Sequence, residues 1–147
     1  MIKETINKIQ QSFSRQGLMR LMNAKLVSVN EGKVVIECAF GEGLTQQNGF
    51  FHAGVLTSLV DVACGYAANS LMQPDEEVLT VEFNVNFLKP ARTPKLIAVG
   101  QVLQSGKTLT VCEGFVYDES GQMLLAKMTA TMIAIKRNNN TPPVPQS

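Results

Sequence analysis

The chain has 147 residues, of which 45% are hydrophobic and 17% charged, and its formal net charge is +1. This length is typical of one domain that buries a core of its own, and a nearly neutral charge excludes the basic surface that nucleic-acid binding needs. The charged fraction lies below the usual level of about a quarter, which favours an oligomer that hides part of its surface.

The cysteines and the apolar runs indicate a soluble protein of the cytoplasm. The three cysteines lie far apart and include no Cys-x-x-Cys pair, so the sequence predicts neither a disulfide framework nor a zinc site. Because no apolar stretch reaches the roughly 20 residues that span a bilayer, we expect no membrane partner.

The two ends of the chain differ in their predicted structure. Ile2, Ile6 and Ile9 recur at helical spacing, which predicts a short amphipathic helix docked on the domain, within an N-terminal helical segment 1–20. The segment lacks the continuous apolar core of a signal peptide. The tail 138–147 is rich in Asn and Pro and has almost nothing to bury, so we expect it to be disordered.

The first strands are predicted near the N-terminal segment. Residues 26–29 and 33–40 are rich in Val and Ile and flank Asn30-Glu31-Gly32, where the glycine can take positive φ, so they predict a hairpin. Residues 41–49 read as a loop.

One long apolar helix is predicted in the middle of the chain. From Ala53 to about Met72, apolar residues recur at spacings of three and four, and Pro74 prevents further helix. Apolar side chains lie nearly all round this helix, so other elements must surround it.

Strands follow the helix. Residues 78–88 alternate strictly, with Val81, Phe83, Val85 and Phe87 on one side. Further strands are predicted at 96–103, 108–117 and 123–135, joined by compact hairpin turns. The predicted fold class is α+β, an antiparallel sheet of about six strands wrapped around one central helix.

Asp61 is the residue of greatest chemical interest. It is the only charged residue between Glu42 and Asp75, and it lies within the apolar helix. An ionised group among apolar neighbours costs several kcal/mol unless it is paired or hydrogen-bonded, and no Lys or Arg lies nearby in the sequence. Asp61 is therefore a candidate catalytic group, although a core carboxylate held for stability alone is the alternative.

The same region carries a resemblance to a known family. The run His52-Ala53-Gly54 followed by Asp61, preceded by Gln46-Gln47-Asn48-Gly49 and followed by residues 82–91, resembles the hotdog-fold acyl-CoA thioesterases, in particular the PaaI-like (phenylacetyl-CoA or aryl-CoA thioesterase) subgroup. The resemblance implies a single hotdog thioesterase domain over residues 1–137, which hydrolyses an acyl-CoA to a carboxylic acid and free CoA. Hydrolysis needs only water and substrate, so no cofactor or metal is implied.

The resemblance also implies a site. Asp61 matches the catalytic acid, as general base or nucleophile, and the backbone N–H of Ala53, where the family usually has Gly, matches an oxyanion donor at the helix N-terminus. Gln46 matches a residue that orients the carbonyl or the water, and Thr80 one that positions the water. The candidate substrate-binding residues are Asn48, Gly49, His52, Gly54, Thr57, Gly65 and Lys107.

Helix geometry predicts that the site needs two chains. Ala53 and Asp61 are eight residues apart, which is about 12 Å along a helix, so one thioester cannot contact both. If both act, they come from antiparallel helices of two copies. We therefore expect a homodimer with composite sites, and hotdog thioesterases commonly assemble further into tetramers. The stripe Thr57, Asp61, Gly65 and Asn69 is expected to face the partner and the substrate.

Several of these residues could have a structural role instead of a catalytic one. His52 directly precedes the helix and is favoured as a residue that fixes the loop, while Gln46 could solvate the loop and Thr80 could be an ordinary strand residue. The CoA phosphates need positive side chains, for which Lys89, Arg92, Lys95, Lys107, Lys136 and Arg137 are candidates.

Three other functions stay open. A hydratase or dehydratase of the same fold would use His52 as a catalytic group, a sensor would bind acyl-CoA without turnover, and an interaction module would bind no thioester. The sequence leaves open the acyl group, whether aryl, short aliphatic or longer, and the carrier, which could be coenzyme A or an acyl carrier protein.

Overall fold

The computed structural model describes residues 2–137 of the chain, and the predicted disordered tail lies outside the described residues. Helices and strands follow the predicted order, with a helix added near the N-terminus. The elements are the helices α1 (Ile2–Ser14), α2 (Gly17–Leu21) and α3 (Ala53–Asn69), the short 3-10 helix η1 (Glu42–Leu44), and the strands β1 (Ala24–Asn30), β2 (Lys33–Ala39), β3 (Glu76–Phe87), β4 (Lys95–Ser105), β5 (Leu109–Tyr117) and β6 (Leu124–Lys136).

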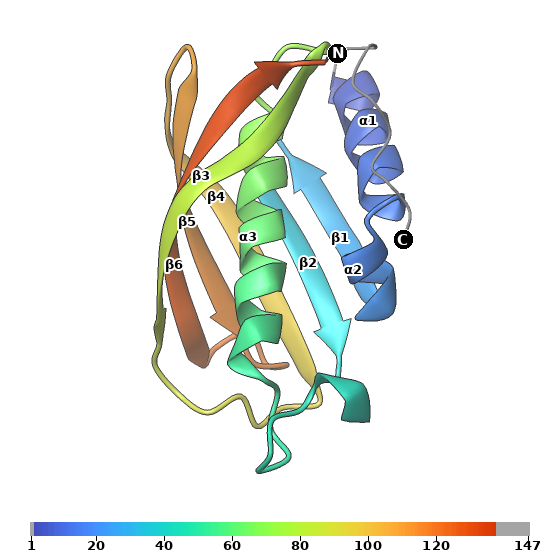
Figure 1. Ribbon diagram of the computed structural model, residues 1–147, viewed down its shortest axis with the longest axis vertical. Helices are drawn as coiled ribbons and strands as arrows, with labels where there is room; N and C mark the ends of the chain where they lie inside the picture. Colours follow the sequence, from blue (N-terminus) through green and yellow to red (C-terminus); the bar gives the residue numbers. More distant parts are fainter. Residues whose placement is uncertain (1, 138–147) are drawn as a thin grey trace, which may run out of the picture.

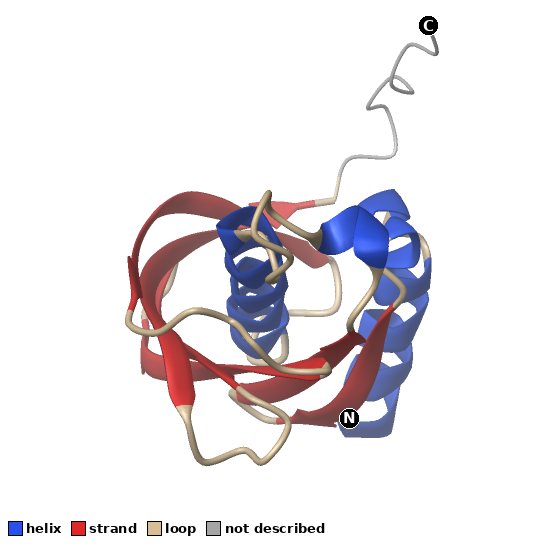
Figure 2. Ribbon diagram, turned by 90° about the horizontal axis from the view of Figure 1, so that it is seen from below, coloured by secondary structure: helices blue, strands red, loops and turns tan. Residues whose placement is uncertain are grey.

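The strands form one antiparallel sheet of six strands in the order β1-β2-β4-β5-β6-β3. The sheet curls around α3, while α1 and α2 lie beside β1 (Figure 1, Figure 2). The predicted α+β class and the wrapped central helix are confirmed. Within residues 2–137, no helix combines the length and the apolar character needed to cross a bilayer.

Two glycines that pair across neighbouring strands let α3 approach the sheet closely. Gly100 of β4 lies opposite Gly114 of β5, and a Cβ at Gly100 would lie 2.3 Å from the carbonyl oxygen of Ala63. A Cβ at Gly114 would lie 2.4 Å from Cγ2 of Val60. A strand glycine lets another backbone approach closely, so these two positions set the depth at which α3 lies in the sheet.

The edge strand β3 contains a bulge. Its pairing with β6 shifts between Thr80 and Glu82, which leaves Val81 as the extra residue. Before the bulge Val78 and Thr80 face α3, and after it Val85 does, because Val78 and Val85 pack on the core and Thr80 bonds to the helix. The predicted alternation therefore holds only beyond the bulge, because the extra residue changes which positions face inward.

The N-terminal segment is more helical than the short helix predicted. α1 extends to Ser14, and Ile9 is fully buried. The Lys8 ammonium donates to the carbonyl oxygen of Glu76 at 2.6 Å, so the middle of α1 is attached to the first residue of β3. Burial lowers the pKa of Lys8 from its ordinary value.

Candidate active site

Asp61 lies half-buried on α3, and its carboxylate is held by one side chain. The Thr80 hydroxyl donates to Oδ1 of Asp61 at 2.8 Å, and no ion pair reaches Asp61 within the described part of the chain. Burial raises the pKa of Asp61 above its ordinary value, and the hydrogen bond from Thr80 opposes this rise. The result is a carboxylate that is more basic than a solvated one, which suits proton abstraction.

A cavity of about 180 Å³ lies beside Asp61, and we call it the Asp61 chamber. The bulge in β3 helps to form this chamber. Side chains alternate between the two faces of a strand, so Thr80 and Val85 would lie on opposite faces without the extra residue; with it, both face α3. The chamber is lined by Gln16, Asp61, Val62, Gly65, Tyr66, Val78 and Thr80.

The N-terminus of α3 presents a free donor. His52 is the N-cap, and its Nδ1 accepts a hydrogen bond from the Gly54 N–H at 2.8 Å. The Ala53 N–H donates to no group among residues 2–137. Helix N-termini carry partial positive charge and free N–H groups, so Ala53 offers a site where negative charge on an oxygen is stabilised.

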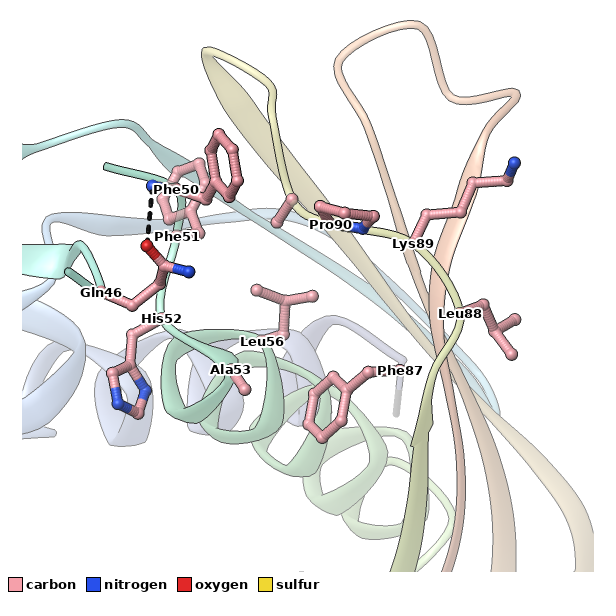
Figure 3. A pocket seen from close by; sticks show the side chains of 11 residues that line it. Gln46, Phe50, Phe51, His52, Ala53, Leu56, Phe87, Leu88, Lys89 and Pro90 are labelled. Carbon is pink, nitrogen blue, oxygen red and sulfur yellow. Dashed lines mark hydrogen bonds between the residues drawn. The ribbon is translucent and has the colours of Figure 1, made fainter. Parts of the chain in front are cut away.

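Gln46 organises the loop before the helix. Its Oε1 accepts from the N–H groups of Asn48 and Phe50, the latter at 3.3 Å, within a turn where Gly49 takes a φ of +85°. The amide nitrogen points toward Leu56 (Figure 3). Gln46 thus holds the loop through its amide oxygen, while its amide nitrogen donates to no group in the described part of the chain.

A second cavity, of about 450 Å³, opens beside this helix end, and we call it the α3 N-terminal cavity. Figure 3 shows its lining from the loop, from α3 and from the end of β3. The lining residues are Gln46, Phe50, Phe51, His52, Ala53, Leu56, Phe87, Leu88, Lys89, Pro90 and Ala91.

The predicted site residues divide between these two cavities. Gln46, His52 and Ala53 line the α3 N-terminal cavity, and Asp61, Gly65 and Thr80 line the Asp61 chamber. The remaining predicted residues line neither cavity: Asn48 and Gly49 are in the turn, Gly54 and Thr57 are on the first turns of α3, and Lys107 is in the turn between β4 and β5.

Two polar residues of the Asp61 chamber were missed by sequence reasoning. Gln16 follows α1 without any motif around it, and Tyr66 belongs to a helix whose pattern indicates only burial. The available signal was Tyr66 itself, because a buried tyrosine hydroxyl needs a hydrogen-bond partner.

The lysines and arginines predicted to meet the CoA phosphates also lie in different places. Lys89 lines the α3 N-terminal cavity, and Cζ of Arg92 lies 4.4 Å from the centre of the Phe50 ring. The others are ion-paired, except Lys107, for which the described residues show no ion pair: Lys95 with Glu37 at 3.3 Å, Lys136 with Asp75 at 3.4 Å and Arg137 with Glu77 at 3.5 Å.

The remaining reactive side chains of residues 2–137 form no metal site and no activated thiol. Between residues 2 and 137, no group of three or more His, Cys, Asp or Glu side chains could hold a metal ion. The cysteines are buried, and burial raises the pKa of Cys112 to about 11 and that of Cys64 further. Both thus stay protonated at neutral pH and are poor nucleophiles.

Comparisons with known proteins agree on one family. A family model described as the thioesterase superfamily matches residues 48–125. The 1,4-dihydroxy-2-naphthoyl-CoA hydrolase of Listeria monocytogenes is 30% identical over 121 residues, which are 82% of this chain and 97% of that protein. The crystal structure of a thioesterase family protein from Silicibacter pomeroyi is 40% identical, with a TM-score of 0.87 over 90% of this chain and 98% of that one. The PaaI protein of E. coli, 20% identical, shares the fold with a TM-score of 0.83 over 92% of this chain and 96% of that one.

Proposed function

The chain belongs to the thioesterase superfamily and is a thioester hydrolase of the hotdog fold, and from this premise we propose that it cleaves acyl-CoA to a carboxylic acid and free coenzyme A, with Asp61 as the catalytic residue. The observation that carries the proposal is the half-buried Asp61 carboxylate, which is bonded to Thr80 and opens onto a chamber of its own.

The Asp61 carboxylate acts by one of two routes. As a general base it takes a proton from water, whose oxygen attacks the thioester carbonyl, after which the C–S bond breaks and the thiolate leaves. As a nucleophile it attacks the thioester carbonyl and expels the thiolate, which gives a mixed anhydride that water then hydrolyses. A single turnover in ¹⁸O-labelled water tests the nucleophile route: label in Asp61 shows an anhydride opened at the Asp61 carbonyl, whereas the base route leaves the protein unlabelled.

The oxyanion donor is proposed to come from a second copy of the chain. Ala53 and Asp61 lie on the same helix, eight residues apart, which is about 12 Å, and they open into different cavities. An antiparallel α3 from a partner brings the Ala53 N–H of one copy to the Asp61 of the other.

The edge of the sheet supports such a dimer. β3 pairs with β6 on one side alone, and it exposes large apolar side chains. Among these, Leu79 and Val81 are each 54% exposed and Phe83 is 42% exposed. A long apolar edge strand invites pairing with another chain, and antiparallel pairing of two β3 strands would continue the sheet across a two-fold axis. Two such dimers are proposed to form a tetramer.

Lys89 and Arg92 are the proposed partners of the CoA phosphates. Lys89 lines the α3 N-terminal cavity and Arg92 packs over the ring of Phe50, which also lines it, and neither forms an ion pair within the described residues. The cavity next to them then accommodates the pantetheine arm, which places the thioester between the two proposed catalytic elements.

The test of the proposal is thiol release from a panel of aryl and aliphatic CoA thioesters. Asp61→Asn keeps the shape of the side chain and removes its charge, so kcat should fall by about 100-fold to 10,000-fold. Asp75→Asn, an exposed acid paired with Lys136, is the matched control and should keep full activity. Equal turnover of the Asp61→Asn variant and the wild type would reject the proposal.

The composite site has a test of its own. Ala53→Pro removes the backbone N–H at the first helical position, where proline is well tolerated, and should abolish turnover. When Ala53→Pro and Asp61→Asn chains are co-expressed, each mixed dimer regains one intact site, so about a quarter of wild-type activity should return. A mixture that stays inactive would show that both groups act within one chain.

The product distinguishes the rival functions. A hydratase would use His52 as a catalytic group, but Nδ1 of His52 accepts from the Gly54 N–H, which leaves Nε2 as the nitrogen that could meet a substrate. Hydration of an enoyl-CoA without thiol release would favour that reaction. Tight binding of every thioester without turnover would favour a sensor instead.

A further inference from the structure

A third cavity, of about 490 Å³, lies between α1 and the C-terminal end of α3, and we call it the α1 cavity. Its lining comes from the first half of α1, from residues 29–31 at the end of β1, and from residues 69–74, where α3 ends. A volume of this size is typical of small-molecule sites. None of its lining residues belongs to β3, whose edge is proposed to pair in the dimer, or to the two cavities of the proposed active site.

The amide of Asn69 is only half satisfied at this cavity. Its Nδ2 donates to the carbonyl oxygen of Glu76 at 3.4 Å and to Sδ of Met72 at 3.7 Å, while its Oδ1 accepts from nothing in the described part of the chain. Its own chain covers Asn69, which is 5% exposed. No side-chain oxygen or nitrogen of residues 2–137 is both sealed from solvent and without a hydrogen bond. The free Oδ1 therefore faces open space at the α1 cavity, where it can accept from a ligand.

The Lys8 ammonium lies beside this amide. It donates to the same carbonyl oxygen of Glu76 at 2.6 Å and to that of Gln73 at 3.4 Å, so the described residues leave one of its N–H groups free. No carboxylate pairs with Lys8 among residues 2–137. Burial lowers the pKa of Lys8 because its charge is poorly solvated, and a carboxylate on a ligand would supply the missing counter-charge.

The other charges at the α1 cavity are negative. Glu4 lies one turn before Lys8 on α1, and Glu31 follows β1; both are exposed, and neither forms an ion pair within the described residues. These carboxylates would repel a ligand that is only an anion, and Lys8 would repel one that is only a cation. A ligand with both charges avoids both repulsions, because its carboxylate can meet Lys8 while its ammonium donates to Oδ1 of Asn69.

Apolar side chains form much of the remaining wall. Ile2 and Ile6 come from α1, Val29 from β1, and Leu71 and Met72 from the chain after α3. Ile2 and Leu71 are exposed, so an apolar group that covers them is stabilised by burial. Since a cavity of roughly 150 Å³ already holds benzene, a side chain of ordinary size fits here. We propose that the α1 cavity binds a free α-amino acid with an apolar side chain, such as leucine or phenylalanine.

Such a ligand would connect two helices that are far apart in the sequence. Its carboxylate would contact α1 through Lys8, and its ammonium would contact the end of α3 through Asn69. Because it binds the folded protein alone, it should raise the melting temperature. It should also slow amide hydrogen exchange in α1, since opening of α1 would break the site.

The test is calorimetric titration of the full-length protein with L-leucine and L-phenylalanine. Each is compared with two analogues that lack one charge: 4-methylpentanoate and 3-methylbutylamine for leucine, 3-phenylpropanoate and 2-phenylethylamine for phenylalanine. At least one amino acid should bind with a dissociation constant below about 1 mM. It should bind about 10-fold more tightly than either of its analogues, because each analogue loses one charge-assisted hydrogen bond.

Two variants separate the two ends of the ligand. Lys8→Met keeps the length of the side chain and removes its charge, so it should weaken the amino acid about 10-fold without weakening the amine. Asn69→Leu removes the acceptor and should weaken the amino acid without weakening the acid. Lys3→Met changes an exposed lysine of α1 that does not line the cavity, so this matched control should bind as wild type does.

A further variant leaves Lys8 and Asn69 in place, since both also hold the fold together. Glu4→Gln combined with Glu31→Gln changes two exposed side chains and should reduce the preference for the amino acid over its acid analogue by about threefold. The proposal is overturned if neither amino acid binds at about 10 mM, if an analogue binds as tightly as its amino acid, or if Lys8→Met and the double glutamine variant both bind as wild type does. Thiol release is not part of this measurement, so failure of the proposed function would not change its result.

Discussion

Replacing Gly100 with alanine tests whether the backbone contact beneath α3 holds the catalytic helix in place. The new Cβ would lie 2.3 Å from the carbonyl carbon and oxygen of Ala63 and 2.4 Å from the backbone nitrogen of Cys64. Main-chain atoms of a buried helix cannot rotate away, so α3 must move outward by about 1 Å to restore normal contact. That movement loosens the packing of Leu59 and Ala67, both fully buried, against the sheet.

The magnitude follows from this geometry. Overpacking a core costs about 1 to 3 kcal/mol, and we expect about 3 kcal/mol here because the contact is with backbone. With an m-value of about 2 kcal/mol per molar in urea, the unfolding midpoint should fall by about 1.5 M. Wild type and variants must be compared at one protein concentration, because assembly adds to apparent stability.

Two further variants serve as controls, and activity gives a second measurement. A Cβ at Gly114 would meet side-chain atoms of Val60 and Cys64, and one at Gly43 would have nothing within 4 Å, so Gly114→Ala should cost less than Gly100→Ala and Gly43→Ala less than about 0.5 kcal/mol. Thiol release by Gly100→Ala should also fall, since moving α3 disturbs the 2.8 Å bond between Thr80 and Asp61. A Gly100→Ala variant as stable as Gly43→Ala would refute the idea that this contact sets the helix position.

Three other variants test the electrostatics and the cap of α3. Burial raises the pKa of Asp61, so ionised Asp61 destabilises the folded protein above the raised pKa and has no such effect below the ordinary pKa of an aspartate. Asp61→Asn should therefore unfold at a higher urea concentration than wild type at pH 7, and the two urea midpoints should converge toward about pH 3. A difference between the midpoints that does not change with pH would contradict this. Because the hydrogen bond from Thr80 lowers the pKa of Asp61, Thr80→Val should move the acid limb of the kcat/KM profile to higher pH, and an unmoved limb would argue against Asp61 as the titrating group. Loss of the bond between His52 and the Gly54 N–H in His52→Ala should lower the free energy of unfolding by about 1 kcal/mol, and His52→Asn should restore it because asparagine is a good N-cap; equal urea midpoints for the two variants would exclude a capping role.

Most of the architecture was predictable from the spacing of apolar residues. The central helix was predicted to begin at Ala53, where α3 begins, because an apolar helix flanked by a loop and a proline has a strong pattern. The hairpins followed from short polar turns between alternating runs. The end of this helix was predicted less well. α3 ends at Asn69 rather than at Met72, because the chain turns toward β3 from Asn69 and Ser70 onward.

The bulge in β3 was not predictable, because the extra residue is itself apolar. Val81 fits the alternation of Phe83 and Val85, so nothing in the sequence shows that the pairing shifts before Glu82. Partner strands determine register, and they are set by the whole sheet. Asp61 and Thr80 could thus be named as candidates, but not their contact.

The close approach of α3 to the glycine pair could have been predicted from the sequence. An isolated Gly within a strand pattern indicates a close backbone approach, and Gly100 and Gly114 both have this setting. For Gln16 the signal was weaker, because the contact with Tyr66 joins residues 50 positions apart, and no local pattern reports such a distance.

Gln16 lies at the periphery of the molecule, whereas α3 and the glycines beneath it, Gly100 and Gly114, lie at its centre. The N-terminal helices contact the rest mainly through a few anchors, such as Ile9 and Met19, which are at most 1% exposed. Peripheral segments of this kind open at a lower free energy than core strands. Local opening of residues 2–21 would therefore uncover the Tyr66 hydroxyl, which Ser12 and Gln16 contact, without separating α3 from β4 and β5.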